Sequence, residues 1–214
     1  MNVVVVDYGI VNLRNIVRGL EYVGAKVVVS ADPEKVEKAD RVILPGVGAF
    51  AAGMRELHLL GLDEGLNYVA KVGRPILGIC LGMQMLMSVG MEYGQHDGLG
   101  LIPGSVQPIP IGGEAGGQRD RKVPHIGWTA LDYPADPSNW SHSCLSDTPS
   151  KTFFYFVHSF MAVPDDPGCV LGYCVYERLQ LVGAIRKENI TGLQFHPERS
   201  GPAGLAVLQK FISS

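Results

Sequence analysis

The sequence has no excess of positive charge and no long apolar run, and each absence excludes a class of protein. The 214 residues carry a formal net charge of -3, and the most basic segment, 118–122, is interrupted by Asp120. A nucleic-acid partner is therefore not expected. No stretch reaches the roughly 18 apolar residues that cross a bilayer. The N-terminal run of four valines ends at Asp7 and lacks the basic segment of a signal peptide, so no membrane partner is expected either.

Cysteines are few and scattered, which excludes a disulfide framework and a zinc cluster. Cys80, Cys144, Cys169 and Cys174 form no closely spaced pair, and no tight cluster of cysteine and histidine accompanies them. We therefore expect free thiols in a cytoplasmic protein, with no metal and no cofactor. The chain is 46% hydrophobic and 18% charged, which excludes a disordered chain. Its length predicts a single domain over residues 1–214.

The first half of the chain alternates strand and helix patterns. The runs that predict buried strands are 3–6, 26–30, 41–44 and 75–79. Helical patterns follow each of them: one over 13–23 with Gly24 as its C-cap, a short one with Asp32 as N-cap and Pro33 in its first turn, a less regular stretch to Lys71, and one that begins over 81–88. This alternation predicts an α/β fold of the flavodoxin-like kind, an open, mostly parallel twisted sheet with helices on both faces.

The second half of the chain changes character. Glycine and proline are frequent over 98–136, and 112–120 is expected to be an exposed mobile loop. Strand patterns then follow without helices between them, at 152–160, 169–176, 180–187 and 190–195, before a closing helix that contains Leu205, Leu208 and Phe211. Closely spaced strands predict a mixed or antiparallel C-terminal extension of the same sheet.

The motif GICLG at 78–82 carries the strongest chemical signal. Cys80 lies between a buried strand and the start of a helix, with Gly78 and Gly82 two residues to each side. This is the pattern of a nucleophile elbow, a turn so tight that only glycine fits at the flanking positions. The turn places the sulfur at the carboxyl edge of the sheet and at a helix N-terminus, which favours the thiolate. We predict that Cys80 is a nucleophile and that the amide of Leu81 can serve an oxyanion.

A thiol nucleophile needs a base, and among six histidines only His196 has a carboxylate at an orienting spacing. Pro197 separates it from Glu198 just after a predicted strand, so both side chains can share one side of the chain. A carboxylate there would hold the imidazole in the required tautomer. The same spacing occurs in zinc deaminases, but those enzymes need a downstream cysteine pair, and no cysteine follows Cys174. The pattern therefore favours a triad of cysteine, histidine and glutamate.

A glycine-containing loop, LPGVG at 44–48, follows the third predicted strand. Such loops often bind phosphate, but the dinucleotide-binding pattern fails because Ala51 holds its last glycine position, and no GK[ST] is present. A flavin-binding module of the same fold is disfavoured for that reason. Backbone amides near Gly46 and Val47 could instead complete an oxyanion hole beside the cysteine.

Taken together, these motifs resemble class I, triad-type glutamine amidotransferases. In more detail they resemble the glutaminase subunits of imidazole glycerol phosphate synthases, which act in histidine biosynthesis. Met83 supports this branch, because many relatives in other pathways carry histidine there. The motifs are LPGVGAF at 44–50, GICLGMQ at 78–84, KVPHIGW at 122–128, YFVHSF at 155–160 and QFHPERSG at 194–201. The resemblance runs from about Asp7 to about Phe211, nearly the whole chain.

The resemblance implies a role for each matching residue. Cys80 would be the nucleophile, His196 the base and Glu198 its orienting acid, and the amides of Leu81 and Val47 would form the oxyanion hole. The residues implied to hold the substrate glutamine are Gly48, Gln84, His158 and Ser159. The residues implied to lie on or near the face that docks a (β/α)8-barrel cyclase, in a heterodimer, are Asn12, Trp128 and Tyr155. Ammonia released from glutamine would pass to that cyclase, which would make imidazole glycerol phosphate and an aminoimidazole carboxamide ribonucleotide.

Two departures from the family pattern leave alternatives open. Val11 precedes Asn12 where the family usually has glycine, and Thr129 follows the PHIGW segment where the family often has asparagine. Both positions lie near the expected partner face, so a paralogous subunit that supplies ammonia to a surface-sugar amidating synthase is an alternative. A non-catalytic module on the same fold is disfavoured, because the cysteine, the histidine and the glutamate are all retained.

Overall fold

The computed structural model describes residues 2–9, 13–112, 121–134 and 138–213, and its centre is a parallel sheet. Five parallel strands form it in the order β2-β1-β3-β4-β13. Their bounds are β1 Asn2–Val6, β2 Lys26–Ser30, β3 Arg41–Gly46, β4 Ile76–Cys80 and β13 Ile190–Leu193. Each predicted strand of the first half is present within one or two residues of its expected bounds. The predicted mobile loop at 112–120 lies, from residue 113 on, outside the described residues.

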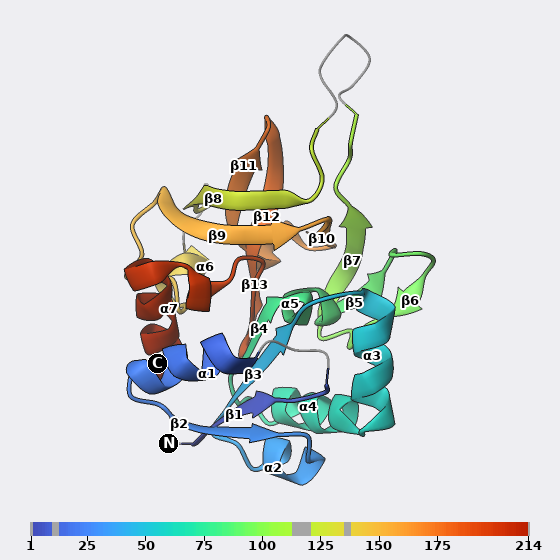
Figure 1. The fold of residues 1–214 in the computed structure, drawn as a ribbon, viewed down its shortest axis with the longest axis vertical. Coiled ribbons are helices and arrows are strands. Elements are labelled where there is room, and N and C mark those ends of the chain that lie inside the picture. The colour runs from blue at the N-terminus through green and yellow to red at the C-terminus, as the bar shows by residue number, and fades with distance from the viewer. Residues whose placement is uncertain (1, 10–12, 113–120, 135–137, 214) are drawn as a thin grey trace.

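The same sheet continues into an antiparallel extension, as the spacing of the later strands predicts. After β13 come β12 Leu179–Lys187, β11 Val170–Tyr176, β8 His125–Asp132 and β9 Thr152–His158. Figure 1 shows β8 and β9 crossing above the carboxyl ends of the parallel strands. Strand β8 is not predicted from sequence, because it lies in the glycine- and proline-rich region and gains its backbone partners only from β9 and β11.

A second sheet of four strands lies near the carboxyl ends of the parallel strands, in the order β10-β7-β5-β6 (Figure 1). The sequence patterns do not predict this sheet. Its strands are β5 Met87–Gly90, β6 His96–Asp97, β7 Ile102–Pro108 and β10 Phe160–Pro164. Two expectations are therefore wrong in detail. The helix expected over 81–88 is shorter, α5 Leu81–Met85, because Met87 pairs with Ile102 of β7. The strand expected over 152–160 divides after His158, and Phe160 begins a strand of the other sheet.

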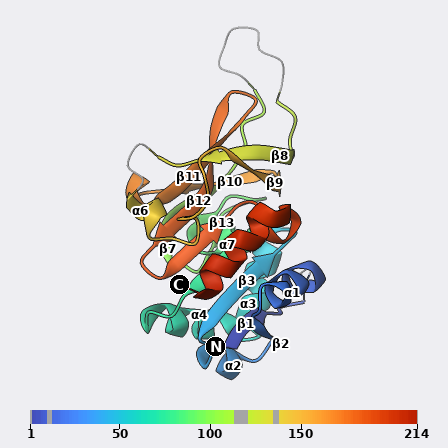
Figure 2. The ribbon, with the colours of Figure 1, turned by 90° about the vertical axis from the view of Figure 1, so that its left-hand side faces the viewer.

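Helices cover both faces of the parallel sheet, as expected. Helices α1 Leu13–Tyr22 and α7 Gly201–Ser213 pack together on one face, and α2 Pro33–Glu37, α3 Phe50–Leu59, α4 Leu62–Lys71 and α5 lie on the other. Figures 1 and 2 show these two layers. Alternate valines of β1 feed two separate cores, Val3 and Val5 beneath α1 and α7, and Val4 and Val6 beneath α2 to α5.

The irregular helical stretch expected to Lys71 is two helices, and the short helix after Asp32 is capped as predicted. Gly61 adopts a φ of +66°, a left-handed conformation that ends α3 and starts α4. The Asp32 side chain accepts a hydrogen bond from the Glu34 amide. The remaining short elements are α6 Ser138–Ser141, η1 Pro167–Cys169 and η2 Pro197–Arg199. No helix in the described ranges is long and apolar enough to cross a membrane.

The carboxyl ends of β3 and β4 meet the start of α5 at very short range. Gly46 pairs with Cys80 in parallel register. A Cβ atom added to Gly82 would lie 1.8 Å from the carbonyl oxygen of Leu44, and one added to Gly78 would lie 2.8 Å from the backbone of Gly82. Both glycines of the GICLG motif are therefore required by close backbone packing.

We predict that Gly82→Ala destabilises the fold by about 3 kcal/mol, because the added methyl group forces α5 away from β3. The measurement is the free energy of unfolding from chemical denaturation. Gly112→Ala is the control, since a Cβ there meets no atom within 4 Å, and it should change stability by no more than about 0.5 kcal/mol. Equal stabilities for both variants would contradict the packing argument.

Candidate active site

Cys80 lies in the sharp turn between β4 and α5. Its φ of 55° and ψ of -111° place it outside the helical and strand regions, a strained conformation for a residue with a side chain. The residue is 7% exposed and lines a pocket of about 410 Å³ at the carboxyl edge of the parallel sheet. The turn aims the sulfur into this pocket, which is where open α/β sheets bind ligands.

The other three cysteines are buried away from this pocket. Burial raises the pKa of Cys144 and of Cys174 to about 12, and burial also raises the pKa of Cys169. All four thiols are free. Of these four, Cys80 alone lines this pocket, so it is the thiol that a ligand bound in this pocket could reach.

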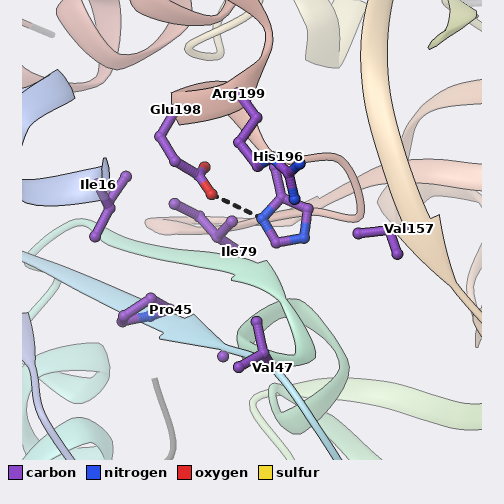
Figure 3. Close-up of a pocket in the computed structure, with 9 residues that line it drawn as sticks. Ile16, Pro45, Val47, Ile79, Val157, His196, Glu198 and Arg199 are labelled. Atoms are coloured by element: carbon purple, nitrogen blue, oxygen red, sulfur yellow. Dashed lines mark hydrogen bonds and ion pairs between the residues drawn. The ribbon is translucent and has the colours of Figure 1, made fainter. Parts of the chain in front are cut away.

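His196 and Glu198 are paired at the same edge, on the turn that leads from β13 into η2. The distance from His196 Nδ1 to Glu198 Oε1 is 2.8 Å, and their side chains are 7% and 9% exposed (Figure 3). Because the carboxylate accepts from Nδ1, the neutral ring has its lone pair on Nε2. Nε2 is buried and has no hydrogen-bond partner among the described residues. His196 lines the pocket together with Cys80.

The charges around His196 favour the imidazolium form. Burial by itself lowers the pKa of His196, but its interactions with Cys80 and with Glu198 outweigh burial and raise the pKa to about 10. A cationic imidazole between a sulfur and a carboxylate can stabilise a thiolate and then give a proton to a leaving group.

The two backbone segments expected to supply an oxyanion hole also border the pocket. Val47 and Leu81 both line it, the first in the loop after β3 and the second at the first position of α5. Beneath this loop the buried Tyr8 hydroxyl donates to the Pro45 carbonyl at 2.9 Å. Burial and the neighbouring Cys80 charge raise the pKa of Tyr8, so the hydroxyl keeps its proton. The carbonyl that precedes Gly46 and Val47 is therefore held in one direction.

The residues expected to hold a substrate also line this pocket. Gly48 has a φ of +94°, which lets the loop turn at the rim. The Gln84 Nε2 group donates to the Phe160 carbonyl at 3.2 Å and to Gln194 Oε1 at 3.0 Å. Both of its N–H groups are then used, so Gln84 offers the pocket only its acceptor oxygen. Ser159 lines the pocket beside His158.

The His158 side chain is engaged within the protein on both ring nitrogens. Nδ1 lies 2.8 Å from the Phe160 carbonyl, and Nε2 lies 3.0 Å from His125 Nδ1. Burial, the largest effect, lowers the pKa of His158 to about 3, so the ring is neutral at pH 7. The ring forms part of the pocket wall, and neither ring nitrogen is free to bind a ligand.

The structure adds pocket residues that the sequence motifs do not identify. Glu92 and Tyr93, in the turn between β5 and β6, line the pocket, as do Pro124, Val157 and Phe160. Glu92 is the only acidic side chain among the residues that line it in the described part of the chain. Its Oε2 accepts from the Phe50 amide at 2.6 Å and so caps α3, whose N-cap residue makes no side-chain cap. No spacing pattern marks Glu92, because only the second sheet brings its turn to the pocket.

A second cavity, of about 80 Å³, lies against the same histidine. Val47, Val157 and His196 line both cavities, and Glu198 and Arg199 line only the smaller one (Figure 3). The second carboxylate oxygen of Glu198 is buried and has no partner among the described residues. The remaining lining residues are Ile16, Pro45, Gly46 and Ile79. In the described ranges no group of three or more His, Cys, Asp or Glu side chains could hold a metal ion.

Two of the residues expected at a partner face, Trp128 and Tyr155, lie on β8 and β9, and Tyr155 contacts Arg199, which lines the smaller cavity. The Trp128 side chain is 54% exposed and makes an edge contact with the ring of Tyr155 at 6.2 Å. The Arg199 guanidinium lies 4.3 Å from the Tyr155 ring centroid. The exposed apolar side chains of Ile126 and Phe153 lie on the same face of these two strands by register. Asn12 lies outside the described residues.

Solved structures share the fold of this chain, and similar sequences identify its family. The structure titled PurLQS from Thermotoga maritima shares the fold with a TM-score of 0.72 at 20% identity, and covers 99% of this chain and 97% of that one. Imidazole glycerol phosphate synthase subunit HisH 1 of Legionella pneumophila (strain Lens) is 44% identical over 211 residues, 99% of this chain and 98% of that protein. Subunit HisH of Geobacter metallireducens is 43% identical over 212 residues, with the same two coverages. The family model described as glutamine amidotransferase class-I matches residues 4–214. The chain therefore belongs to the class-I glutamine amidotransferase family, and within it to the HisH branch.

Proposed function

We propose that this protein is the glutaminase subunit of an imidazole glycerol phosphate synthase. It would hydrolyse glutamine through a cysteinyl thioester and pass the ammonia to a (β/α)8-barrel cyclase in a heterodimer. One observation carries the proposal. The cysteine of a nucleophile elbow shares a pocket with a histidine whose Nδ1 is bound by a buried carboxylate. The Nε2 of that histidine has no hydrogen-bond partner among the described residues. The HisH kinship reported above supplies the substrate and the partner.

In the first step the Cys80 thiolate attacks the carboxamide carbon of glutamine. The carbonyl oxygen then carries a negative charge, which the backbone amides of Leu81 and Val47 stabilise. The His196 imidazolium donates its Nε2 proton to the departing nitrogen, so that ammonia leaves and a glutamyl thioester remains. Glu198 holds the imidazole and stabilises its positive charge throughout this step.

In the second step water hydrolyses the thioester. His196 is now neutral, and its Nε2 accepts a proton from the water as that water attacks the thioester carbon. The bond between carbon and sulfur breaks, glutamate leaves, and the thiolate and the imidazolium form again. The same ring therefore acts first as an acid and then as a base, and Glu198 keeps it in one orientation for both roles.

The pocket chemistry supports a substrate that is an α-amino acid. Gln84 offers only an acceptor and Glu92 is a carboxylate, so both suit the α-ammonium group of glutamine. With its ring nitrogens used, His158 would contribute through its backbone, together with Ser159 and Gly48. Backbone amides in this wall would bind the α-carboxylate.

The smaller cavity supports a route for ammonia toward the partner. It lies on the Glu198 side of His196, and Arg199 at its edge stacks on Tyr155, which contacts Trp128. We place the cyclase over this face. A sheltered route is needed because ammonia in water at pH 7 is mostly protonated and then no longer nucleophilic.

The proposal treats residues 1–214 as a single domain in the cytoplasm. The continuous sheet from β2 to β9 joins both halves of the chain and supports one domain. The four free thiols fit a reducing compartment. The surface-sugar alternative rests only on Val11 and Thr129, and no observation on the site favours it. Co-purification with a sugar-amidating synthase, without an imidazole product, would replace our choice of partner.

We predict that Cys80→Ala abolishes glutamine-dependent product formation by the complex and leaves ammonia-dependent formation unchanged. The variant removes the nucleophile that releases ammonia from glutamine. The cyclase can still use ammonia that is added to the solution. The measurement is product formation with each nitrogen source. Cys144→Ala, a buried thiol away from the pocket, is the control and should keep both activities. Loss of both activities in Cys80→Ala would assign Cys80 to the fold or to the interface.

We predict that Glu198→Gln lowers glutamine-dependent kcat about 100-fold, the scale of acid–base catalysis, and less than Cys80→Ala does. A neutral amide stabilises the imidazolium less, so the pKa of His196 falls from about 10 toward its ordinary value. The alkaline limb of the pH–rate profile should therefore move to lower pH. Glu64→Gln is the control, because Glu64 is exposed on α4, and it should leave the profile unchanged. An unmoved alkaline limb in Glu198→Gln would argue against the orienting role.

We predict that Glu92→Gln raises the KM for glutamine about tenfold and changes kcat by less than about twofold, since it weakens binding and not the chemical step. The side-chain amide oxygen introduced at position 92 can still accept from the Phe50 amide, so the cap of α3 is kept while the negative charge is lost. Steady-state kinetics of the complex measure both constants. A lower kcat with an unchanged KM would place Glu92 away from the α-ammonium group.

A further inference from the structure

A chain of hydrogen bonds crosses from the partner-facing strand β8 to the wall of the glutamine pocket. The Thr129 hydroxyl lies 2.8 Å from His125 Nε2, His125 Nδ1 lies 3.0 Å from His158 Nε2, and His158 Nδ1 lies 2.8 Å from the Phe160 carbonyl. His125 and His158 are direct partners in the antiparallel register of β8 and β9. No family role stated above explains His125 or Thr129.

The carbonyl end of this chain determines the direction of every hydrogen bond in it. A carbonyl only accepts, so His158 carries its proton on Nδ1 and its Nε2 is an acceptor. His125 must then donate from Nδ1, which leaves His125 Nε2 as an acceptor. Among the described residues that nitrogen has one partner, the Thr129 hydroxyl, and the hydroxyl must be the donor. If His125 instead carried its proton on Nε2, its Nδ1 and His158 Nε2 would be two acceptor nitrogens 3.0 Å apart.

The two rings are enclosed, so water cannot replace a lost partner easily. The rings of Phe156 and Tyr176 stack on His125, with centroids 5.0 Å and 4.1 Å away. His125 is 1% exposed and His158 is 5% exposed. Burial lowers the pKa of His125 to about 4, so this ring is neutral at pH 7, as is that of His158. A neutral pair in a fixed direction is therefore the resting state.

The pocket end of the chain holds groups that would touch glutamine. The Phe160 carbonyl also accepts from Gln84 Nε2, and Gln84 donates in turn to Gln194. The fully buried Gln194 points its Nε2 at Cys80 Sγ, 3.8 Å away. A displaced Phe160 carbonyl would therefore turn the Gln84 amide, whose oxygen is the acceptor offered to the substrate.

We propose that Thr129, His125 and His158 form a positioning relay that holds the Phe160 carbonyl, and through it Gln84, in the orientation that binds glutamine. The inference rests on the proposed glutaminase function. It gives the unusual residue Thr129 a role, since its hydroxyl is the terminal donor of the relay. None of the three side chains is a catalytic residue, and their effect is on glutamine binding.

The test compares variants of Thr129 in the assembled complex with its cyclase. Thr129→Val keeps the shape and removes the donor, and we expect the KM for glutamine to rise about tenfold, as for one lost buried hydrogen bond, while kcat changes less than about twofold. Thr129→Ser and Thr129→Asn restore a donor and should keep the KM near that of the unmodified complex. Thr152→Val is the matched control, because within the described part of the chain this hydroxyl on neighbouring β9 bonds only the local Pro149 carbonyl.

Nitrogen-15 NMR of the histidine rings in the full chain tests the direction of the relay without any activity. We expect both His125 and His158 to be neutral at pH 7 with the proton on Nδ1, and the His125 signals to shift in Thr129→Val but not in Thr152→Val. A proton on His158 Nε2 would overturn the relay, and so would a Thr129→Val complex whose KM equals that of Thr152→Val. An assembled complex that hydrolyses no glutamine would instead overturn the proposed function, and this inference with it.

Discussion

The site depends on the contact between the start of α5 and the end of β3. Gly82 packs so closely on the Leu44 carbonyl that no side chain fits between them, and this contact brings the loop of Val47 beside the turn of Cys80. The left-handed backbone at Cys80 is held by these neighbours, and the strain is stored where the sulfur enters the pocket. Nucleophile and candidate oxyanion donors are thus products of one backbone packing arrangement.

Two kinds of buried histidine lie in or behind the pocket wall, and they show how the effect of burial on a histidine pKa depends on whether the ring has a charged partner. Burial favours the neutral ring at His158 and at His125, where the neighbours are a carbonyl, a hydroxyl and another neutral ring. At His196 the same burial is outweighed by Cys80 and Glu198, and the cation is favoured. The neutral ring of His158 forms part of the pocket wall, with His125 bonded behind it, and the cationic ring of His196 lines both the pocket and the smaller cavity.

The antiparallel extension and the second sheet contribute different residues to the site beside the parallel core. Strands β8 and β9 present Trp128 and Tyr155 outward while they bury His125 and His158 inward, because side chains alternate along a strand. The second sheet brings Glu92 to the pocket and supplies the cap of α3. The face assigned to the cyclase and the face assigned to glutamine therefore share the same pair of strands.

The parallel core, the cysteine elbow and the pairing of His196 with Glu198 could be predicted from the sequence, because each depends on residues close together in the chain. Valine runs, flanking glycines and a two-residue spacing are local patterns, and local geometry follows from them. Strand β8, the four-stranded sheet and the early end of α5 depend on backbone partners that are distant in sequence, and weak local patterns cannot identify such partners. The use of both N–H groups of Gln84, the engagement of His158 and the arrival of Glu92 at the pocket were likewise decided by the tertiary structure. Hydrogen bonds between different elements exist only after the chain has folded.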